Sequence, residues 1–241
     1  MRSVSVIVPW DRAYRRARQV RRGRKRPPPG YDAFFADVER RFGVRPLWLE
    51  ADHLDHPGRS DVRPRLEVVL ERTAEHQQFL KAPLTFDGAR RRAVAEMFVQ
   101  HITARTLASM FGLPRRRVDQ PDLPQQILVT FSDFERVALE DARASLTTRE
   151  EDDFEAGLEL GDELWCVKRS GWWPVVFVHT DAQARAVEAA DLLARWADAY
   201  FALVTEHDEF AYLTREQVSV AVDSKERFDN DFAGNWYHYI K

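Results

Sequence analysis

The chain has 241 residues, of which 44% are hydrophobic and 12% aromatic, so it is not an intrinsically disordered protein and can form one large domain or two smaller ones. Its formal net charge of −3 hides an uneven distribution. Residues 1–30 hold ten Lys and Arg against one acid, residues 31–149 hold eighteen of each, and residues 150–241 hold eight against twenty. Such asymmetry is typical of a polyanion-binding segment joined to a different kind of domain.

Cysteine and apolar content exclude several classes of protein. Cys166 is the only cysteine, which rules out an intramolecular disulfide and a cysteine-based zinc site, and its apolar neighbours predict a buried, inert thiol. No apolar run approaches the roughly 20 residues that cross a bilayer, and the N-terminus lacks the apolar core of a secretory signal. An arginine-rich transit peptide is the alternative, but Val4–Val8 alternates like a strand. We therefore expect a cytoplasmic protein without a membrane partner.

The first half, 1–124, is predicted to be mostly helical with a short strand pair. A charged arm follows the strand at Val4–Val8 and ends at Pro27-Pro28-Pro29-Gly30, which stops a helix. The remaining expected elements are a helix over 31–42 with Gly43 as its stop, a strand over 46–49, and helices over 65–80 and 88–101.

The second half, 125–241, is predicted to be an α/β region with a mainly antiparallel sheet, so the fold class is α+β. Pro121 and Pro124 mark the domain boundary. A hairpin turn at Ser170-Gly171 joins two strands, and Pro174 favours an edge position for the second. The expected elements are strands over 127–131, 164–168, 173–178, 218–222 and 235–240, and one long helix over 181–206 capped by Thr180.

The segment from Thr103 to Val118 has the spacing of two helices joined by a tight turn. Ala108 allows a close helix crossing, Gly112 supplies the turn, and a second helix would start at Pro114. This pattern resembles the helix-turn-helix class, which implies DNA binding through Arg105, Arg115, Arg116 and Arg117. Pro121 would shorten the second helix, and three consecutive arginines point around it, so an ordinary helical hairpin with a solvated arginine rim is the alternative.

The arm is the densest cation cluster, although arginine outnumbers lysine 31 to 5, a skew typical of coding bias. Clustered cations bind phosphates by releasing counterions. Two alternatives also account for the cluster of cations: the arm docks on the acidic C-terminal half, or it is a solvated loop. The predicted phosphate-binding residues are Arg12, Arg15, Arg16, Arg18, Arg21, Arg22, Arg24, Lys25 and Arg26.

Two short motifs resemble parts of metal sites. Asp52-His53-Leu54-Asp55-His56 resembles the metallo-β-lactamase metal motif, which implies ligation by His53, Asp55 and His56, but Ala51 replaces its first histidine. Asp223-Ser224-Lys225 resembles the acid-x-Lys element of metal-dependent nucleases, which implies that Asp223 holds a metal beside Lys225, with Asp208 as a second ligand. The simpler interpretation of the first motif is a polar loop, and that of the second is a chance occurrence. We therefore expect no metal or other cofactor.

Tryptophans and acids of the second half suggest a protein partner as another function. Trp172 and Trp173 are neighbours at a turn and cannot both point inward, so one is expected to be an exposed anchor. The acidic run 150–153 is expected to be a solvated linker or a helix start.

The sequence favours a non-enzymatic nucleic-acid-binding or regulatory protein, because it has no glycine-rich phosphate loop, nucleophile elbow or paired-histidine helix. A module that binds a protein partner through its acidic C-terminal surface is the second interpretation, and a metal-dependent nuclease is the third. The oligomeric state is left open.

Overall fold

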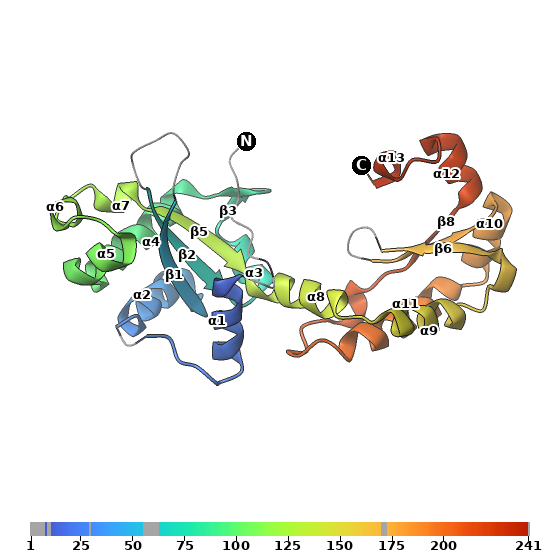
Figure 1. The fold of residues 1–241 in the computed structure, drawn as a ribbon, viewed down its shortest axis with the longest axis horizontal. Helices are drawn as coiled ribbons and strands as arrows, with labels where there is room; N and C mark the ends of the chain where they lie inside the picture. Colours follow the sequence, from blue (N-terminus) through green and yellow to red (C-terminus); the bar gives the residue numbers. More distant parts are fainter. Residues whose placement is uncertain (1–7, 9–10, 29, 55–62, 170–172, 241) are drawn as a thin grey trace. The chain divides into compact units, whose positions relative to one another are not determined.

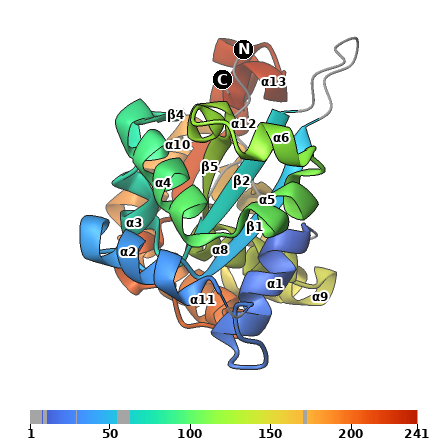
Figure 2. The ribbon, with the colours of Figure 1, turned by 90° about the vertical axis from the view of Figure 1, so that its left-hand side faces the viewer.

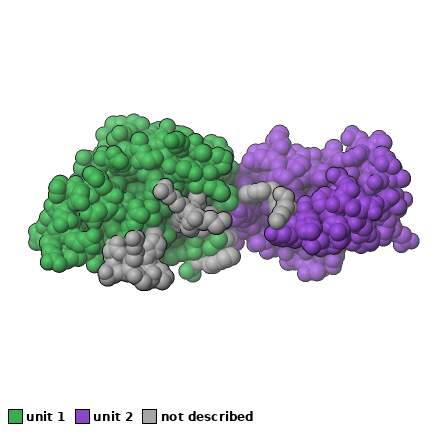
Figure 3. Space-filling view, turned by 90° about the horizontal axis from the view of Figure 1, so that it is seen from above, with its two compact units in different colours: residues 1–138 green, residues 139–241 purple. Residues whose placement is uncertain are grey.

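The computed structural model describes residues 8, 11–28, 30–54, 63–169 and 173–240, and its helices and mixed sheets confirm the α+β class (Figure 1). The chain divides into two compact units, Met1–Ala138 and Leu139–Lys241 (Figure 3). This division also separates charge: the first unit has 26 Lys and Arg against 17 acids, and the second has 10 against 22. The helices of the described residues are too short or too polar to span a lipid bilayer.

The first unit is built on a three-stranded sheet of order β1-β2-β5, with β1 at Trp48–Leu54, β2 at Arg63–Leu70 and β5 at Leu128–Asp133. β1 and β2 pair antiparallel, and β2 and β5 pair parallel with Arg65 opposite Leu128. Because β5 pairs with β2, the segment after residue 124 belongs to the first unit, and the division lies at residue 138 instead of near 124.

The two faces of this sheet have different coverings, because successive strand residues point to opposite sides. Leu66, Val68 and their neighbours on one face pack against α2 (Asp32–Phe42), α4 (Gly88–His101) and α5 (Ala104–Phe111) in one apolar core. The other face, which carries Trp48, Glu50 and Glu67, packs against α1 (Arg12–Arg21) (Figure 2). The first unit is completed by α3 (Thr73–Gln77), β3 (Leu80–Ala82), β4 (Thr85–Phe86), α6 (Arg115–Val118), α7 (Leu123–Gln126) and the start of α8 (Phe134–Ala144).

Local signals account for most of the first unit. Gly43 ends α2 in the left-handed region with a φ of 72°, as expected, and Asp87 caps α4 through its side chain. The helix expected over 65–80 is wrong: β2 occupies its first part, because these residues pair with strands on both sides. Residues 66–70 are buried without interruption, which fits a strand that is covered on both faces.

The second unit contains a second three-stranded sheet, of order β6-β7-β8. β6 and β7 pair antiparallel as the predicted hairpin requires, but β7 and β8 pair parallel, so the sheet is mixed and not mainly antiparallel. β7 is therefore central, and Pro174 lies just before it instead of marking an edge. The elements are α9 (Thr148–Gly157), β6 (Leu164–Lys168), β7 (Val175–Val178), α10 (Asp181–Ala189), α11 (Leu192–Thr205), β8 (Ala221–Ser224), α12 (Lys225–Phe232) and α13 (Trp236–Ile240), with short 3-10 turns at Gly161–Glu163 and Arg215–Gln217.

Three predictions for the second unit need correction. The long helix over 181–206 breaks at Asp191, whose φ of 55° is left-handed, although Thr180 caps its start as expected. The strand expected over 218–222 begins only at Ala221. The strand expected over 235–240 is the helix α13, because Asn235 accepts a hydrogen bond from the Tyr237 backbone N–H and so begins a helix.

Residues at the C-terminus of α12 provide a test of backbone strain. Ala233 ends the helix with a φ of 52°, a conformation that costs a non-glycine residue about 1 kcal/mol or more. Ala233→Gly should therefore raise the free energy of unfolding by about 1 kcal/mol, measured by urea denaturation. Gly234, with a φ of 64°, is the matched control, and Gly234→Ala should destabilise the protein; equal effects of the two changes would contradict the explanation.

Candidate functional site

The helix-turn-helix-like segment folds as a helix, a glycine turn and one further helical turn. Thr103 caps α5 by accepting a hydrogen bond from the Thr106 N–H at 3.3 Å, and Gly112 makes the turn with a φ of 61°. Pro114 is the residue before α6 and not its first helical position, and α6 has only four residues. A helix this short cannot present a recognition surface along a major groove, so base reading of the helix-turn-helix kind is not supported by its geometry.

The apolar residues of the segment hold it against the core of the first unit, as the spacing predicts. The buried side chains are Leu107, Phe111, Leu113 and Val118. They fix the turn firmly, so the arginines that follow have a defined place on the surface.

The arginines of the segment point into different surroundings. Arg105 and Arg116 are exposed, and Arg115 is exposed beside Asp119 at 4.0 Å, a distance that makes a weak ion pair. Arg117 is half-buried and its Nη2 donates to Gln126 Oε1 at 3.2 Å, which ties α6 to the end of α7.

Beside this contact lies a hollow of about 170 Å³ lined by three arginines, which the sequence analysis did not single out. Arg63 comes from the start of β2, and Arg91 and Arg92 come from α4. Gln125, the neighbour of the residue that binds Arg117, lines the same hollow. We define the arginine surface as Arg63, Arg91 and Arg92 of the hollow together with Arg116 and Arg117 of α6, since the bond between Arg117 and Gln126 joins α6 to the end of α7.

Protein contacts hold the hollow in shape. Arg91 Nε donates to the Val129 carbonyl at 2.8 Å, which fixes one guanidinium against the sheet. Asp87 Oδ1 accepts hydrogen bonds from the N–H groups of Ala89 and Arg90, and these bonds, the one from Arg90 foremost, lower the pKa of its carboxyl. Since Asp87 occupies the first N–H groups of α4, the positive charge of the hollow comes from its guanidinium groups. The run 90–92 on a predicted helix was the only sequence signal for it.

The basic arm is not an extended segment in the described residues. Arg12–Arg21 forms α1, with Ala13, Tyr14 and Ala17 buried against the sheet, and Tyr14 stacks on Phe134 with 5.2 Å between ring centroids. The expected strand at Val4–Val8 lies outside the described residues, apart from Val8.

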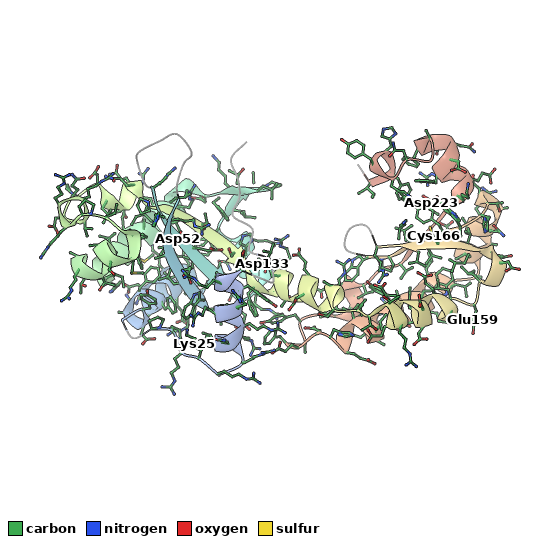
Figure 4. All side chains as sticks on the ribbon, in the orientation of Figure 1. Lys25, Asp52, Asp133, Glu159, Cys166 and Asp223 are labelled. Carbon is green, nitrogen blue, oxygen red and sulfur yellow. The ribbon has the colours of Figure 1, made fainter. Side chains whose placement is uncertain are left out.

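Two arginines of the arm pair with acids of its own unit. Arg12 pairs with Glu50, and Arg21 Nε donates to Glu71 Oε1 at 2.7 Å. Lys25, which is labelled in Figure 4, lies over Trp48 with its Nζ 5.1 Å from the ring centroid. Among the other predicted phosphate-binding residues, Arg18 and Arg22 also interact within the protein, whereas the exposed cations without an ion pair in the described chain are Arg15, Arg16, Arg24 and Arg26.

A polar cluster lies on the sheet face beneath α1. Arg65 binds Asp52 through two nitrogens, at 2.8 and 2.5 Å, and Glu67 Oε1 accepts from Ser132 Oγ at 2.6 Å. Glu67 is only 4% exposed, and its burial raises the pKa of the carboxyl above the usual value. Thr130, its neighbour across the β2–β5 pair, is buried with a hydroxyl that has no partner in the described residues.

The first metal motif is divided by the structure. Asp52 is bound to Arg65 on β1, and the exposed His53 approaches the turn at Gly112, while Asp55 and His56 lie outside the described residues. Groups of three or more acids, histidines or cysteines placed to hold a metal are not present in the described ranges.

The second metal motif is used in internal contacts. Asp223 Oδ2 accepts a hydrogen bond from Tyr239 Oη at 2.9 Å, and burial of the phenol, followed by this bond, raises the pKa of Tyr239. Lys225 pairs with Asp229 one turn along α12. Asp208 Oδ2 accepts from the Leu213 N–H at 2.7 Å and so closes a turn. All three residues thus have partners within the second unit.

The expected partner anchor is half-buried. Trp173 packs edge-to-face against Tyr200 at 6.5 Å between ring centroids, and Arg143 lies over its ring, while Trp172 lies outside the described residues.

Cys166 is half-buried and not fully buried as expected, and desolvation raises the pKa of its thiol, in keeping with low reactivity.

The acidic run is a helix start, one of its two predicted forms. Glu150 accepts hydrogen bonds from the backbone N–H and the hydroxyl of Thr147, both at 2.7 Å, and from His207. These contacts, the backbone bond first, lower the pKa of Glu150 to about 2, so this carboxylate stays charged.

Comparison of the chain with protein-family models, with curated proteins and with solved structures finds no match.

The buried carboxyl of Glu67 predicts a pH-dependent stability difference. Because the pKa is raised in the folded state, the unfolded chain ionises first as pH increases, and folding loses stability between the unfolded and folded pKa values. Glu67→Gln should therefore be more stable than the wild type at neutral pH and gain nothing at a pH below the usual glutamate pKa. Urea denaturation across this range measures the difference, and a constant difference at all pH values would exclude the burial argument.

Proposed function

We propose that the first unit binds nucleic acid through phosphate groups, as a non-enzymatic binding or regulatory protein, and that the arginine surface makes the contact. The observation that carries this proposal is the hollow lined by Arg63, Arg91 and Arg92. Guanidinium groups match phosphate oxygens in shape and charge, and a hollow can receive an oxygen from several sides.

Charge supports the same assignment. The first unit has 26 Lys and Arg against 17 acids, so a polyanion is attracted to it as a whole. Arg63, Arg92 and Arg116 are exposed and form no ion pair in the described residues, so binding a phosphate breaks no existing ion pair of theirs.

The geometry favours contact with the phosphate backbone over reading of bases. α6 offers one helical turn, and its neighbouring arginines diverge, so they cannot reach adjacent base edges together. Binding that depends on phosphates alone is strongly dependent on salt and weakly dependent on sequence.

The arm has a smaller part in this proposal than its composition indicates. Two of its arginines are paired with Glu50 and Glu71, and α1 lies on the sheet face opposite the core helices. Its remaining exposed arginines attract a polyanion only through their charge. Replacing three of them removes as much charge as replacing three arginines of the arginine surface, so they provide a matched control.

A charge-matched pair of variants tests the proposal. Arg63→Gln/Arg92→Gln/Arg116→Gln should weaken binding of a labelled duplex DNA by about tenfold or more near 50 mM salt and reduce the slope of log affinity against log salt by about 2 to 3. Fluorescence anisotropy at several salt concentrations measures both quantities with the full chain.

Arg15→Gln/Arg16→Gln/Arg24→Gln removes the same charge from the arm and should weaken binding less. Thermal denaturation should show that both triple variants remain folded. The proposal fails if the wild type does not bind duplex DNA at low salt, or if the arm variant loses at least as much affinity as the arginine-surface variant.

A further inference from the structure

The second unit contains a separate hollow of about 330 Å³ between α9 and α11. The two helices run antiparallel: Glu150 near the start of α9 binds His207 beyond the end of α11, at 2.9 Å. At the opposite end, Glu159, which follows α9 and is labelled in Figure 4, pairs with Arg195 in the first turn of α11 at 2.6 Å. The hollow is therefore an elongated groove between helices.

Small residues create this groove. Gly157 on α9 faces open space, since a Cβ placed there would meet no atom within 4 Å, and Ala199 and Ala202 on α11 add little bulk. Larger side chains at these positions would fill the space between the helices. The groove is thus a direct result of the sequence of both helices.

The ends of the groove differ in chemistry. Gly157, Leu158 and Trp196 form an apolar end, where α9 ends and α11 begins. Glu150 and Asp153 on α9, with Glu206 at the end of α11, form an acidic end. Seven residues separate Glu150 from Gly157, which is about 10 Å along a helix. A complementary ligand is apolar at one end and cationic at the other.

The charges at the acidic end are available to a cation. The low pKa of Glu150, about 2, keeps it ionised, and its protein partner is a histidine and the cap of its own helix. Asp153 has only a distant pair with Arg149 at 3.8 Å, with both side chains largely exposed, and Glu206 is exposed without an ion pair in the described residues. The second unit as a whole has 10 bases against 22 acids.

The apolar end has an unsatisfied group. Trp196 is 1% exposed, and its indole N–H has no acceptor in the described part of the chain. A buried donor without an acceptor costs about 1 to 3 kcal/mol and is rare in folded proteins. This nitrogen is itself closed to solvent, so Trp196 lines the groove through its other atoms.

We infer that this groove binds a basic amphipathic helical segment of a partner protein, with an apolar side chain at the Trp196 end and a Lys or Arg at the carboxylates. The length of the groove equals about two helical turns, which suits the helix-in-groove mode of recognition. The acidic end selects a basic segment and repels an acidic one. This site is distinct from the arginine surface and does not depend on nucleic-acid binding.

A labelled amphipathic peptide of about 14 leucines and lysines is a suitable probe, with the same peptide carrying glutamate in place of lysine as its control. The full chain should bind the lysine peptide with a micromolar dissociation constant in a fluorescence anisotropy titration, and it should not bind the glutamate peptide. Equal binding of both peptides, or of neither, overturns the inference.

Two pairs of variants locate the binding. Ala202→Trp fills the groove without changing charge and should weaken binding at least tenfold, whereas Ala186→Trp, at an exposed position of α10, should leave it unchanged. Asp153→Asn/Glu206→Gln should also weaken binding about tenfold, while Asp162→Asn/Glu188→Gln removes the same charge elsewhere with a smaller effect. Equal effects within either pair would show nonspecific attraction and overturn the assignment of the groove.

Discussion

Parallel pairing of β2 with β5 is the constraint on which the first unit depends. Parallel neighbours begin at the same edge of a sheet, so the chain between them must cross over one face before it returns. That crossing contains α4 to α7, and it brings the residues just before β5 beside Arg63 at the start of β2. The arginine hollow is formed at this edge, from three segments that are distant in the sequence.

The same constraint explains what the sequence could and could not predict. Signals within a few residues were sufficient for α2 with Gly43, for α4 with Asp87 and for the turn at Gly112, because caps and left-handed glycines act locally. The apolar spacing of β2 fits a helix as well as a strand, and only its pairing on both sides decides between them. The residues next to Arg63 and Arg92 in the sequence do not indicate that these two arginines line the same hollow, so only the folded structure reveals it.

The aromatic C-terminus shows how local and distant effects compete. The residues after Asn235 have strand propensity, but the asparagine cap starts a helix that places Trp236 and Tyr239 on one side. Both rings pack on Phe177 in the second sheet, and Trp236 also packs on Phe228. Aromatic packing is thus satisfied by helical spacing, and propensity alone gives the wrong element.

The formal charge of the whole chain is a poor guide to its surfaces. The division at residue 138 leaves a positive first unit and a negative second unit, although the total is −3. At physiological ionic strength, charges more than about 8 Å apart are largely screened, so a ligand responds to the groups near its own site. The arm illustrates this: its high charge is reduced by Glu50 and Glu71, while Arg63 and Arg92 line one hollow and are exposed. Local arrangement, and not the number of cations in a segment, therefore decides which basic residues can bind an anion.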